Sequence, residues 1–343
     1  MPKATIDDVA KLAGVSIKTV SRVVNREPNV REQTREKVES AIMRLNYRPN
    51  KAAQNLASHH SRLFVLIYDD PSAYEIPSAG FIIRMQGGAL RACRTANYEL
   101  LIHPCRYRSK DVGAELRGLI EQVRPDGIVL AAPLSNVPRV VEAIAATGTP
   151  FVRVSPGKAN GSSLVVATND REASAEMTRY LASLGHKRIA FIKGHPGHKA
   201  VGNRFRGYLD GLRDSGLEAC DALIAKGDNS IRSGEAAAVE LLEKDKPPTA
   251  IFAANDDMAA GVIRVADRLG IKVPGQLSVA GCDDIALAQQ IYPALTTINQ
   301  PLAKMAEAAV LMLIESQRNG KNPDGPVIVQ GALQVRESTG PAS

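Results

Sequence analysis

Apolar residues recur with helical spacing in the first part of the chain. Between residues 6 and 13 they fall at i, i+3, i+4 and i+7, which predicts one buried stripe of an α-helix: Ile6, Val9, Ala10 and Ala13. Thr5 stands at the N-cap, and Asp8 follows three residues later, as in a capping box. Gly14 ends the helix, because glycine adopts the left-handed conformation of a C-terminal cap without strain.

A second helix follows after a short turn. Ser16 caps its start, and Val20, Val23 and Val24 point inward. The opposite face carries side chains suited to DNA: Ile17, Lys18, Ser21 and Arg22. An α-helix fits the major groove, where an arginine matches guanine O6 and N7 and an apolar side chain contacts a thymine methyl. The alternative is a helical hairpin inside a bundle, with an ordinary solvated face.

The pattern predicts a third helix over residues 32–45. Its apolar face consists of Val38, Ala41, Ile42 and Leu45. Arg31 is a poor cap, so we expect fraying at the start of this helix, or a phosphate contact. Tyr47 is expected to pack the three helices together. A further helix of about eight residues, capped by Asn50, is marginal by itself in water because it is so short.

From Leu63 onward, short β-rich runs alternate with helical stretches. This alternation predicts parallel sheets covered by helices, and it occurs in two successive series, which indicates two similar lobes. We expect the chain to cross between the lobes near residues 154–166, again near residues 283–295, and once more in the C-terminal segment. Several crossovers of this kind are typical of a hinged clamshell.

Polar side chains follow several of the predicted strands. Ligands of such sheets bind in the crevice at the C-terminal ends of the strands. Sugar hydroxyls are suitable partners for Asp, Asn and Arg side chains there. Two structural alternatives stay open: Arg204 and Asp283 could form an ion pair across the cleft, and Asn255 or Asp256 could cap a helix. The residues at or soon after strand ends are Asp69, Asp70, Tyr74, Ser155, Arg204, Asn255, Asp256, Asp283 and Asp284.

Charge is concentrated at the N-terminal end. Residues 1–62 hold 12 Lys and Arg against 6 Asp and Glu, while the rest of the chain holds 31 against 30. A basic module beside a nearly neutral body is the electrostatic pattern of a DNA-binding protein. A membrane-surface arm would explain the charge as well, but it would not need two capped helices joined by a turn.

Composition excludes several other classes of protein. The chain has 343 residues, of which 44% are hydrophobic, with no run long enough to span a membrane. Its first residues, MPKATIDD, contain no apolar segment, so we expect no secretory signal. The four cysteines are scattered without C-x-x-C or histidine pairing, which favours reduced thiols in a cytoplasm: Cys93, Cys105, Cys220 and Cys282.

Two segments, VAKLAGVSIKTVSRVVN and TREKVESAIMRLNYRPN, closely resemble the DNA-binding headpiece of the lac repressor (LacI/GalR) family of bacterial transcription regulators. The resemblance extends to about Val335, and the body also resembles periplasmic sugar-binding proteins. It implies an all-α helix-turn-helix headpiece (residues 1–48), a hinge helix with a linker (residues 49–62), and an α/β clamshell of two subdomains for effector binding and dimerisation (residues 63–343).

The resemblance also implies the residues that bind DNA. Leu56 of the hinge helix matches the leucine that enters the minor groove at the operator centre, where such a wedge unstacks a base step. The alternative is a leucine packed against its own headpiece. The full implied set is Thr5, Ser16, Ile17, Lys18, Ser21, Arg22, Asn25, Asn50 and Leu56.

Family matching assigns the effector site to residues that follow strands: Tyr74, Ser155, His198, Arg204, Asn229, Asn255 and Asp283. Arg204 and Asp283 match the effector-binding arginine and aspartate. Ser155 departs from the pattern, because several members have an aspartate there, and this leaves the N-terminal half of the pocket uncertain. An exposed loop residue is the structural alternative for His198.

These observations predict a cytoplasmic, homodimeric repressor of carbohydrate-utilisation genes that a sugar releases from palindromic double-stranded operator DNA. Residues 81–96 and 112–123 lie on the faces that the resemblance assigns to the dimer. The sequence lacks nucleotide-binding glycine motifs, G-x-S-x-G and metal-ligand clusters, so we expect no enzyme, cofactor or metal. The alternatives are a corepressor-dependent regulator that responds to a nucleobase or another metabolite, and a sugar-transport receptor.

Overall fold

The computed structural model describes residues 4–24, 28–47, 60–70, 80–157, 164–320, 323 and 325–343. The chain divides into two compact units, Met1–Ser61 and Arg62–Ser343, and each is described here by itself. Four residues with predicted roles lie outside the described ranges, together with most of the predicted hinge helix: Asn25, Asn50, Leu56 and Tyr74.

In its described residues, the first unit contains three helices around a small apolar core: α1 (Ile6–Ala13), α2 (Ile17–Val24) and α3 (Glu32–Arg44). Val9, Val20 and Val38 are fully buried, one from each helix, and Tyr47 packs against them as predicted. Burying a valine stabilises a fold by about 1.5–3 kcal/mol, so these contacts hold together helices that are short for independent stability.

The helix ends in this unit confirm the capping expectations. Thr5 and Asp8 form a reciprocal capping box, with the Thr5 N–H donating to Asp8 Oδ2 at 2.9 Å. Gly14 ends α1 at a φ of 66°. The Thr19 N–H donates to Ser16 Oγ at 3.2 Å, so Ser16 caps α2. Arg31 precedes α3 without a side-chain cap.

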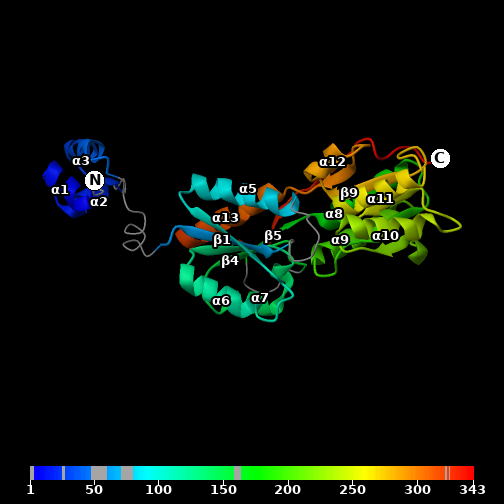
Figure 1. Ribbon diagram of the computed structural model, residues 1–343, viewed down its shortest axis with the longest axis horizontal. Coiled ribbons are helices and arrows are strands. Elements are labelled where there is room, and N and C mark those ends of the chain that lie inside the picture. The colour runs from blue at the N-terminus through cyan, green and yellow to red at the C-terminus, as the bar shows by residue number, and fades with distance from the viewer. Residues whose placement is uncertain are drawn as a thin grey trace. The chain divides into compact units, whose positions relative to one another are not determined.

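The second unit contains two sheets of the same design, each covered by helices on both faces (Figure 1). The N-lobe (residues 62–168 and 302–329) has the strand order β11-β5-β4-β3-β1-β2, all parallel. Its strands are β1 (Leu63–Asp69), β2 (Glu99–Cys105), β3 (Gly127–Leu130), β4 (Phe151–Val154), β5 (Leu164–Thr168) and β11 (Val327–Val329). Its helices are α5 (Gly80–Thr95), α6 (Val112–Val123), α7 (Pro138–Ala145) and α13 (Leu302–Asn319).

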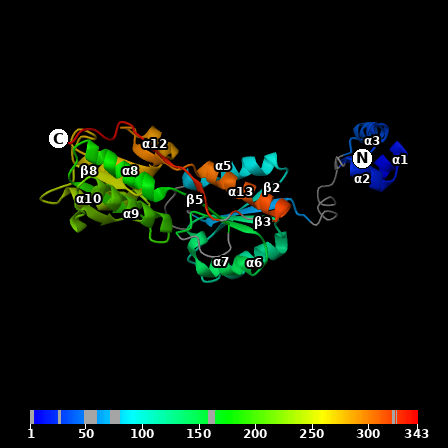
Figure 2. The same cartoon turned by 180° about the vertical axis from the view of Figure 1, so that it is seen from behind.

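Alternation along β1 explains how the N-lobe sheet is covered. Phe64 and Leu66 pack into the cluster that contains α5 and α13, while Val65 and Ile67 pack toward α6 and α7. Successive side chains of a strand point to opposite faces, so a continuous apolar run suits a strand that is buried on both sides. Helices α5 and α13 lie side by side on one face (Figures 1 and 2).

The C-lobe (residues 170–300 and 332–343) has the order β12-β10-β9-β8-β6-β7, and only the β10–β12 pair is antiparallel. Its strands are β6 (Ile189–Lys193), β7 (Ile224–Lys226), β8 (Ala250–Ala253), β9 (Ser278–Asp283), β10 (Thr296–Asn299) and β12 (Ala332–Gln334). Its helices are α8 (Asp170–Ser183), α9 (Lys199–Asp214), α10 (Ile231–Leu242), α11 (Asp256–Arg268) and α12 (Ala286–Gln290).

Three segments join the lobes, but two predicted crossing points are wrong. Residues 164–168 form β5 of the N-lobe, so the first crossing follows Thr168 and not residues 154–166. Strands β9 and β10 pair within the C-lobe, so the second crossing follows β10 and not residues 283–295. The third crossing, between β11 and β12, lies in the C-terminal segment as predicted. Short β-rich runs such as residues 164–168 carry too little periodicity to be assigned from sequence.

The first five strands of each lobe have a doubly wound order. The second strand lies on one side of the first strand, and the third, fourth and fifth strands lie on the other side. Ligands of such sheets bind outside the C-terminal ends of the strands at that point. In the N-lobe this is where β1 and β3 end, and in the C-lobe it is where β6 and β8 end. Within the described residues, no helix is both long and apolar enough to cross a bilayer.

Candidate functional site

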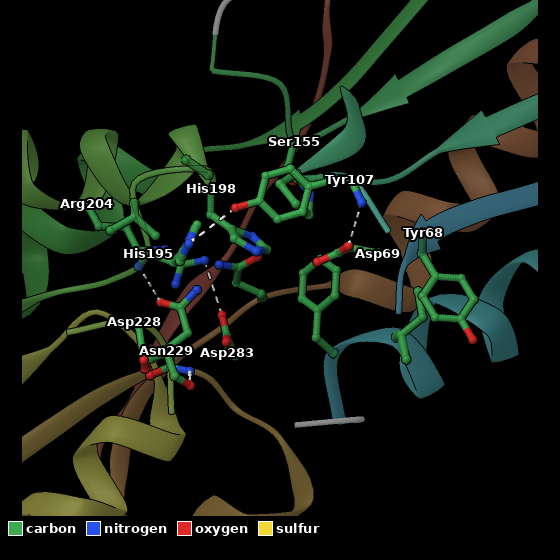
Figure 3. A pocket seen from close by; sticks show the side chains of 18 of the residues that line it. Tyr68, Asp69, Tyr107, Ser155, His195, His198, Arg204, Asp228, Asn229 and Asp283 are labelled. Atoms are coloured by element: carbon green, nitrogen blue, oxygen red, sulfur yellow. Dashed lines mark hydrogen bonds and ion pairs between the residues drawn. The ribbon is translucent and has the colours of Figure 1, made fainter. Parts of the chain in front are cut away.

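A cavity of about 400 Å³ lies between the two lobes at these strand ends. Figure 3 shows its side chains converging from both sides, with Tyr68 and Asp69 opposite Arg204, Asn229 and Asp283. The volume falls within the range of ordinary ligand pockets. Six of the seven predicted effector residues line the cavity: Ser155, His198, Arg204, Asn229, Asn255 and Asp283. The seventh, Tyr74, lies outside the described residues.

Arg204 is the buried cation at the centre of the C-lobe wall. Its Nε donates to Asp170 Oδ1 at 2.9 Å, its Nη1 donates to the Ala254 carbonyl oxygen, and its Nη2 lies 3.2 Å from Asp283 Oδ1. A buried charge needs partners of this kind, because transfer out of water is costly. The Arg204–Asp283 ion pair exists, but both residues belong to the C-lobe, so the expectation of a pair across the cleft is wrong.

Asp283 is held in an uncommon conformation at the end of β9. Its φ is +117°, and the residue is buried, with 8% of its surface exposed, at the cavity. Burial raises the pKa of the Asp283 carboxyl to about 7, against the opposing effect of Arg204. Within the described residues, Oδ1 accepts no hydrogen bond, since its contact with Arg204 has ion-pair distance without hydrogen-bond geometry. This buried oxygen therefore keeps unused acceptor capacity at the wall of the cavity.

Asn255 and Asn229 form the neighbouring part of the wall. Asn255 caps α11 by accepting from the Met258 N–H at 3.1 Å, which confirms the capping alternative for this residue. Its Nδ2 donates to the Asn229 carbonyl oxygen at 2.9 Å. Asn229 has a φ of +76°, and its Oδ1 occupies the space beside Gly194, where a Cβ would come within 2.1 Å. The close approach requires glycine at position 194.

His198 and Ser155 face the cavity from opposite lobes. His198 immediately precedes α9 and is half-buried, so the expectation of an exposed loop residue is wrong. Burial, together with His195 and Arg204, lowers the pKa of His198 to about 4, so its ring is neutral at pH 7. Ser155 follows β4, is buried, and has a φ of +50°.

The N-lobe wall contains residues that the sequence interpretation left out of the site. Tyr107 and Arg108 follow β2, and they meet His195, which follows β6. Tyr68 and Phe81 also line the cavity, although Phe and Tyr together make up only 4% of the chain. The rule that ligands bind after strands applied to β2 and β6 as well. It would have pointed to Tyr107, Arg108 and His195 directly.

The first unit presents the predicted DNA-facing residues on the outer side of α2. Ile17 is 47% exposed, and Lys18 and Arg22 are exposed, while Ser21 is half-buried. Ile17 and Lys18 occupy the first turn, which is the end of a recognition helix that reaches base edges. Thr5 and Ser16 are exposed caps of α1 and α2. This geometry suits a helix that enters a major groove.

Among the described residues, no group of three or more His, Cys, Asp or Glu side chains is placed to hold a metal ion. The carboxylates that line the cavity, and Asp170 behind Arg204, engage protein groups instead. Asp170 binds Arg204, Asp69 accepts from the Tyr107 N–H at 3.1 Å, and Asp228 accepts from the Ser230 N–H at 3.0 Å. The arrangement is suited to binding a polar organic molecule by hydrogen bonds.

Two family models match the chain. A model described as bacterial regulatory proteins, lacI family, matches residues 5–50, and a periplasmic binding protein-like domain matches residues 178–339. The first match covers helices α1, α2 and α3 of the first unit. The second covers most of the C-lobe together with α13 and β11 of the N-lobe.

Similar proteins match over nearly the whole length. The HTH-type transcriptional regulator DegA of Bacillus subtilis (strain 168) is 32% identical over 341 residues, which cover 99% of either chain. The structure of a lac repressor dimer bound to operator and the anti-inducer ONPF has a TM-score of 0.82 at 26% identity, covering 99% of this chain and 100% of that one. A transcriptional regulator CelR–cellobiose complex has a TM-score of 0.74 at 29% identity, covering 98% and 99%.

Proposed function

Because this chain belongs to the lacI family of bacterial regulatory proteins, we propose that it represses carbohydrate-utilisation genes and leaves its operator when a sugar binds between the lobes. The family consists of transcription regulators and not of enzymes, so the chain is a DNA-binding regulator. The sugar, the palindromic operator, the homodimer and the cytoplasmic location are the parts that we propose.

The first unit supplies DNA binding in this proposal. Two copies of α2, related by the two-fold axis of a homodimer, enter successive major grooves of a palindromic operator. Arg22 reads a guanine, Ile17 contacts a thymine methyl, and Lys18 and Ser21 donate to bases or phosphates. The roles of Thr5 and Ser16 are to position α1 and α2 and to meet phosphates. Asn25, Asn50 and Leu56 lie outside the described residues and keep the roles that the resemblance implies.

The observation that carries the sugar assignment is the Arg204–Asp283 pair at the cavity. Asp283 Oδ1 has acceptor capacity beside a fixed guanidinium, which suits a hydroxyl that donates to the carboxylate and accepts from the arginine. Tyr68 and Phe81 offer apolar surface for the carbon face of a sugar ring. A similar regulator has been solved in complex with cellobiose, and this supports the same class of ligand here.

The lobes provide the coupling. A ligand that contacts both lobes binds more tightly at one separation of the lobes than at another. This difference in affinity sets how far the ligand can shift the equilibrium between the two separations. Helices α5 and α6 carry the proposed dimer face, so a shift of the N-lobes changes the spacing of the two DNA-binding units. Cofactors and metals have no part in this mechanism. A corepressor would use the same coupling between the lobes and the DNA-binding units, but its binding would strengthen DNA binding.

Fluorescence anisotropy with labelled DNA from upstream of the protein's own gene tests the proposal. We expect salt-sensitive binding to a palindrome, released by one member of a panel of mono- and oligosaccharides. Binding that no sugar releases, but that a nucleobase strengthens, would favour the corepressor alternative. Absence of binding to any palindrome at low salt would contradict the proposed function itself.

A further inference from the structure

The three crossovers between the lobes are bonded to one another where they meet. The first crossover follows Thr168, the second follows Asn299, and the third lies between β11 and β12. The Gly331 N–H of the third crossover donates to Asn169 Oδ1 of the first at 2.7 Å, and Asn169 Nδ2 donates to the Gly331 carbonyl oxygen at 3.3 Å. One side-chain amide therefore holds the first and third crossovers together through both of its polar atoms.

The second crossover reaches the same point from two directions. Gln300 Nε2 donates to Asp170 Oδ1 of the first crossover over a longer distance of 3.4 Å. The Asn299 carbonyl oxygen would lie only 2.9 Å from a Cβ atom added at Gly331, so the second and third crossovers pack backbone against backbone. Each crossover therefore contacts both of the others, and Gly331 lies where a side chain would push them apart.

The side chain of Asn169 does not serve its own helix. Asn169 occupies the N-cap of α8, but its side chain makes no capping hydrogen bond. An asparagine at this position ordinarily accepts from a backbone N–H of the first turn. Asn255 does so at the start of α11, where it accepts from the Met258 N–H. The amide of Asn169 is directed to Gly331 instead, so its contacts connect the crossovers and not the first turn of α8.

The meeting point of the crossovers is bonded to the wall of the cavity. Asp170, the residue after Asn169, is buried and accepts from Arg204 Nε at 2.9 Å. Arg204 lines the cavity together with Gln300 (Figure 3). The carboxylate that accepts from both of these cavity residues is therefore adjacent in the chain to the amide that holds Gly331. A ligand that moves Arg204 acts on the first crossover through one hydrogen bond.

We propose that Asn169 is a positioning residue that makes the three crossovers a single joint and so sets the path along which the lobes open and close. Hinge motions are absorbed by a few residues at the ends of elements, which is where Asn169 and Gly331 lie. Three crossovers without mutual bonds would let the lobes twist as well as open. This inference concerns the regulation of the same cavity and rests on the proposed function.

A distance between spin labels on the two lobes, measured by pulsed electron paramagnetic resonance, tests the joint in the full-length protein. Cys220 of the C-lobe is exposed while the other three cysteines are buried, so Cys220 takes one label. Lys110→Cys, at an exposed position of the N-lobe, takes the second. Dilution with unlabelled chains restricts the measurement to distances within one chain. We expect a narrow distribution of distances with the natural joint.

Two variants perturb the joint by different means. Asn169→Ser should widen the distribution, because serine is a favourable N-cap for α8 but is too short to bond both backbone groups of Gly331. Gly331→Ala should shift the distribution, because the added Cβ displaces the Asn299 carbonyl oxygen. The matched controls are Asn319→Ser, exposed at the end of α13, and Gly202→Ala on α9, where no atom lies within 4 Å of an added Cβ. Both controls should keep the natural distribution.

An unchanged distribution in both Asn169→Ser and Gly331→Ala would overturn the inference. A lower temperature of thermal unfolding in Asn169→Ser, with the natural distribution retained, would assign Asn169 to stability alone. The same widening in Asn319→Ser would contradict a specific joint at Asn169. No DNA and no sugar enter this measurement, so its failure is distinguishable from a failure of the proposed function, which the anisotropy experiment reports separately.

Discussion

At the scale of single residues, Asp283 combines burial, an ion pair and a titration near neutral pH. Its pKa of about 7 lies above the ordinary 3.8, so the folded protein holds this proton more firmly than the unfolded chain. The resulting contribution to stability is full below about pH 3.8 and is lost as the pH rises through about 7. We expect Asp283→Asn to remove this dependence, measured by thermal unfolding between pH 4 and 8.

The same titration should control ligand binding, because only the ionised Asp283 carboxylate accepts at both oxygens. Affinity for the effector should therefore rise between about pH 6 and 8 in the natural protein. It should be weak and independent of pH in this range in Asp283→Asn. Asp267→Asn, an exposed change on α11, is the matched control. Collapse of the fold in Asp283→Asn would instead favour a purely structural ion pair with Arg204.

Arg22 is the residue that we expect to contribute most to sequence recognition. Arg22→Ala should weaken binding to the preferred operator by about 1–3 kcal/mol and relax the preference at one base pair, because a bidentate contact to guanine is lost. Lys37→Ala, on the exposed side of α3, should not change base preference. Anisotropy with operators changed one base pair at a time measures both. If Arg22→Ala weakened binding to all operators by the same factor, Arg22 would contact a phosphate and not a base.

Part of the site followed from sequence because strand ends can be recognised in the chain. Arg204, Asn255 and Asp283 were predicted in this way, and all three line the cavity. The same rule, applied to the ends of β2 and β6, also points to Arg108 and His195, but their contact depends on how two loops from different lobes meet. No spacing within one segment reports such a contact. The partnership of Arg204 with Asp170 depends on tertiary structure in the same way.

At the scale of elements, α5 connects the cavity to the face proposed for the dimer. Arg84 on α5 donates to the carbonyl oxygens of Asp283 at 3.2 Å and Asp284 at 2.7 Å, both in the C-lobe. The start of α5 also lies against the side chain of Ile285. A Cβ atom added at Gly80 would be 3.0 Å from Ile285 Cγ2. Ile83 on the same helix is 60% exposed. A change at Asp283 can therefore reach α5 directly.

Arg84→Met should preserve ligand affinity while reducing the release of DNA, because it removes the donor that links α5 to Asp283. Arg94→Met, an exposed change at the other end of α5, should leave both quantities unchanged. Calorimetry gives the ligand affinity, and anisotropy at saturating ligand gives the release. Full release in Arg84→Met would show that the coupling bypasses this contact.

The elements themselves differed in how well the sequence determined them. Both ends of α1 and the start of α2 agree with the sequence prediction, because apolar spacing, Thr5, Gly14 and Ser16 all agree locally. Strand β5 was missed, because a five-residue apolar run between two other segments has no distinctive period. The crossover positions were wrong for the same reason: they depend on which sheet a short strand joins.

At the scale of the whole molecule, two units with different chemistry perform one function. Residues 1–62 carry most of the excess positive charge, and binding through phosphates should fall steeply with salt. The ligand cavity belongs to a body with almost no net charge, so its affinity should depend much less on salt, apart from any anionic group of the ligand. The coupling between the two must be reciprocal, because binding free energies are linked.

The most direct test of this account measures ligand affinity with and without saturating operator DNA. The account predicts that operator weakens ligand binding by the same factor by which ligand weakens operator binding, about 5–150-fold for typical couplings. A stronger affinity on the operator would identify a corepressor. Equal affinity in the two states would contradict the central claim that a ligand in the cleft controls DNA binding.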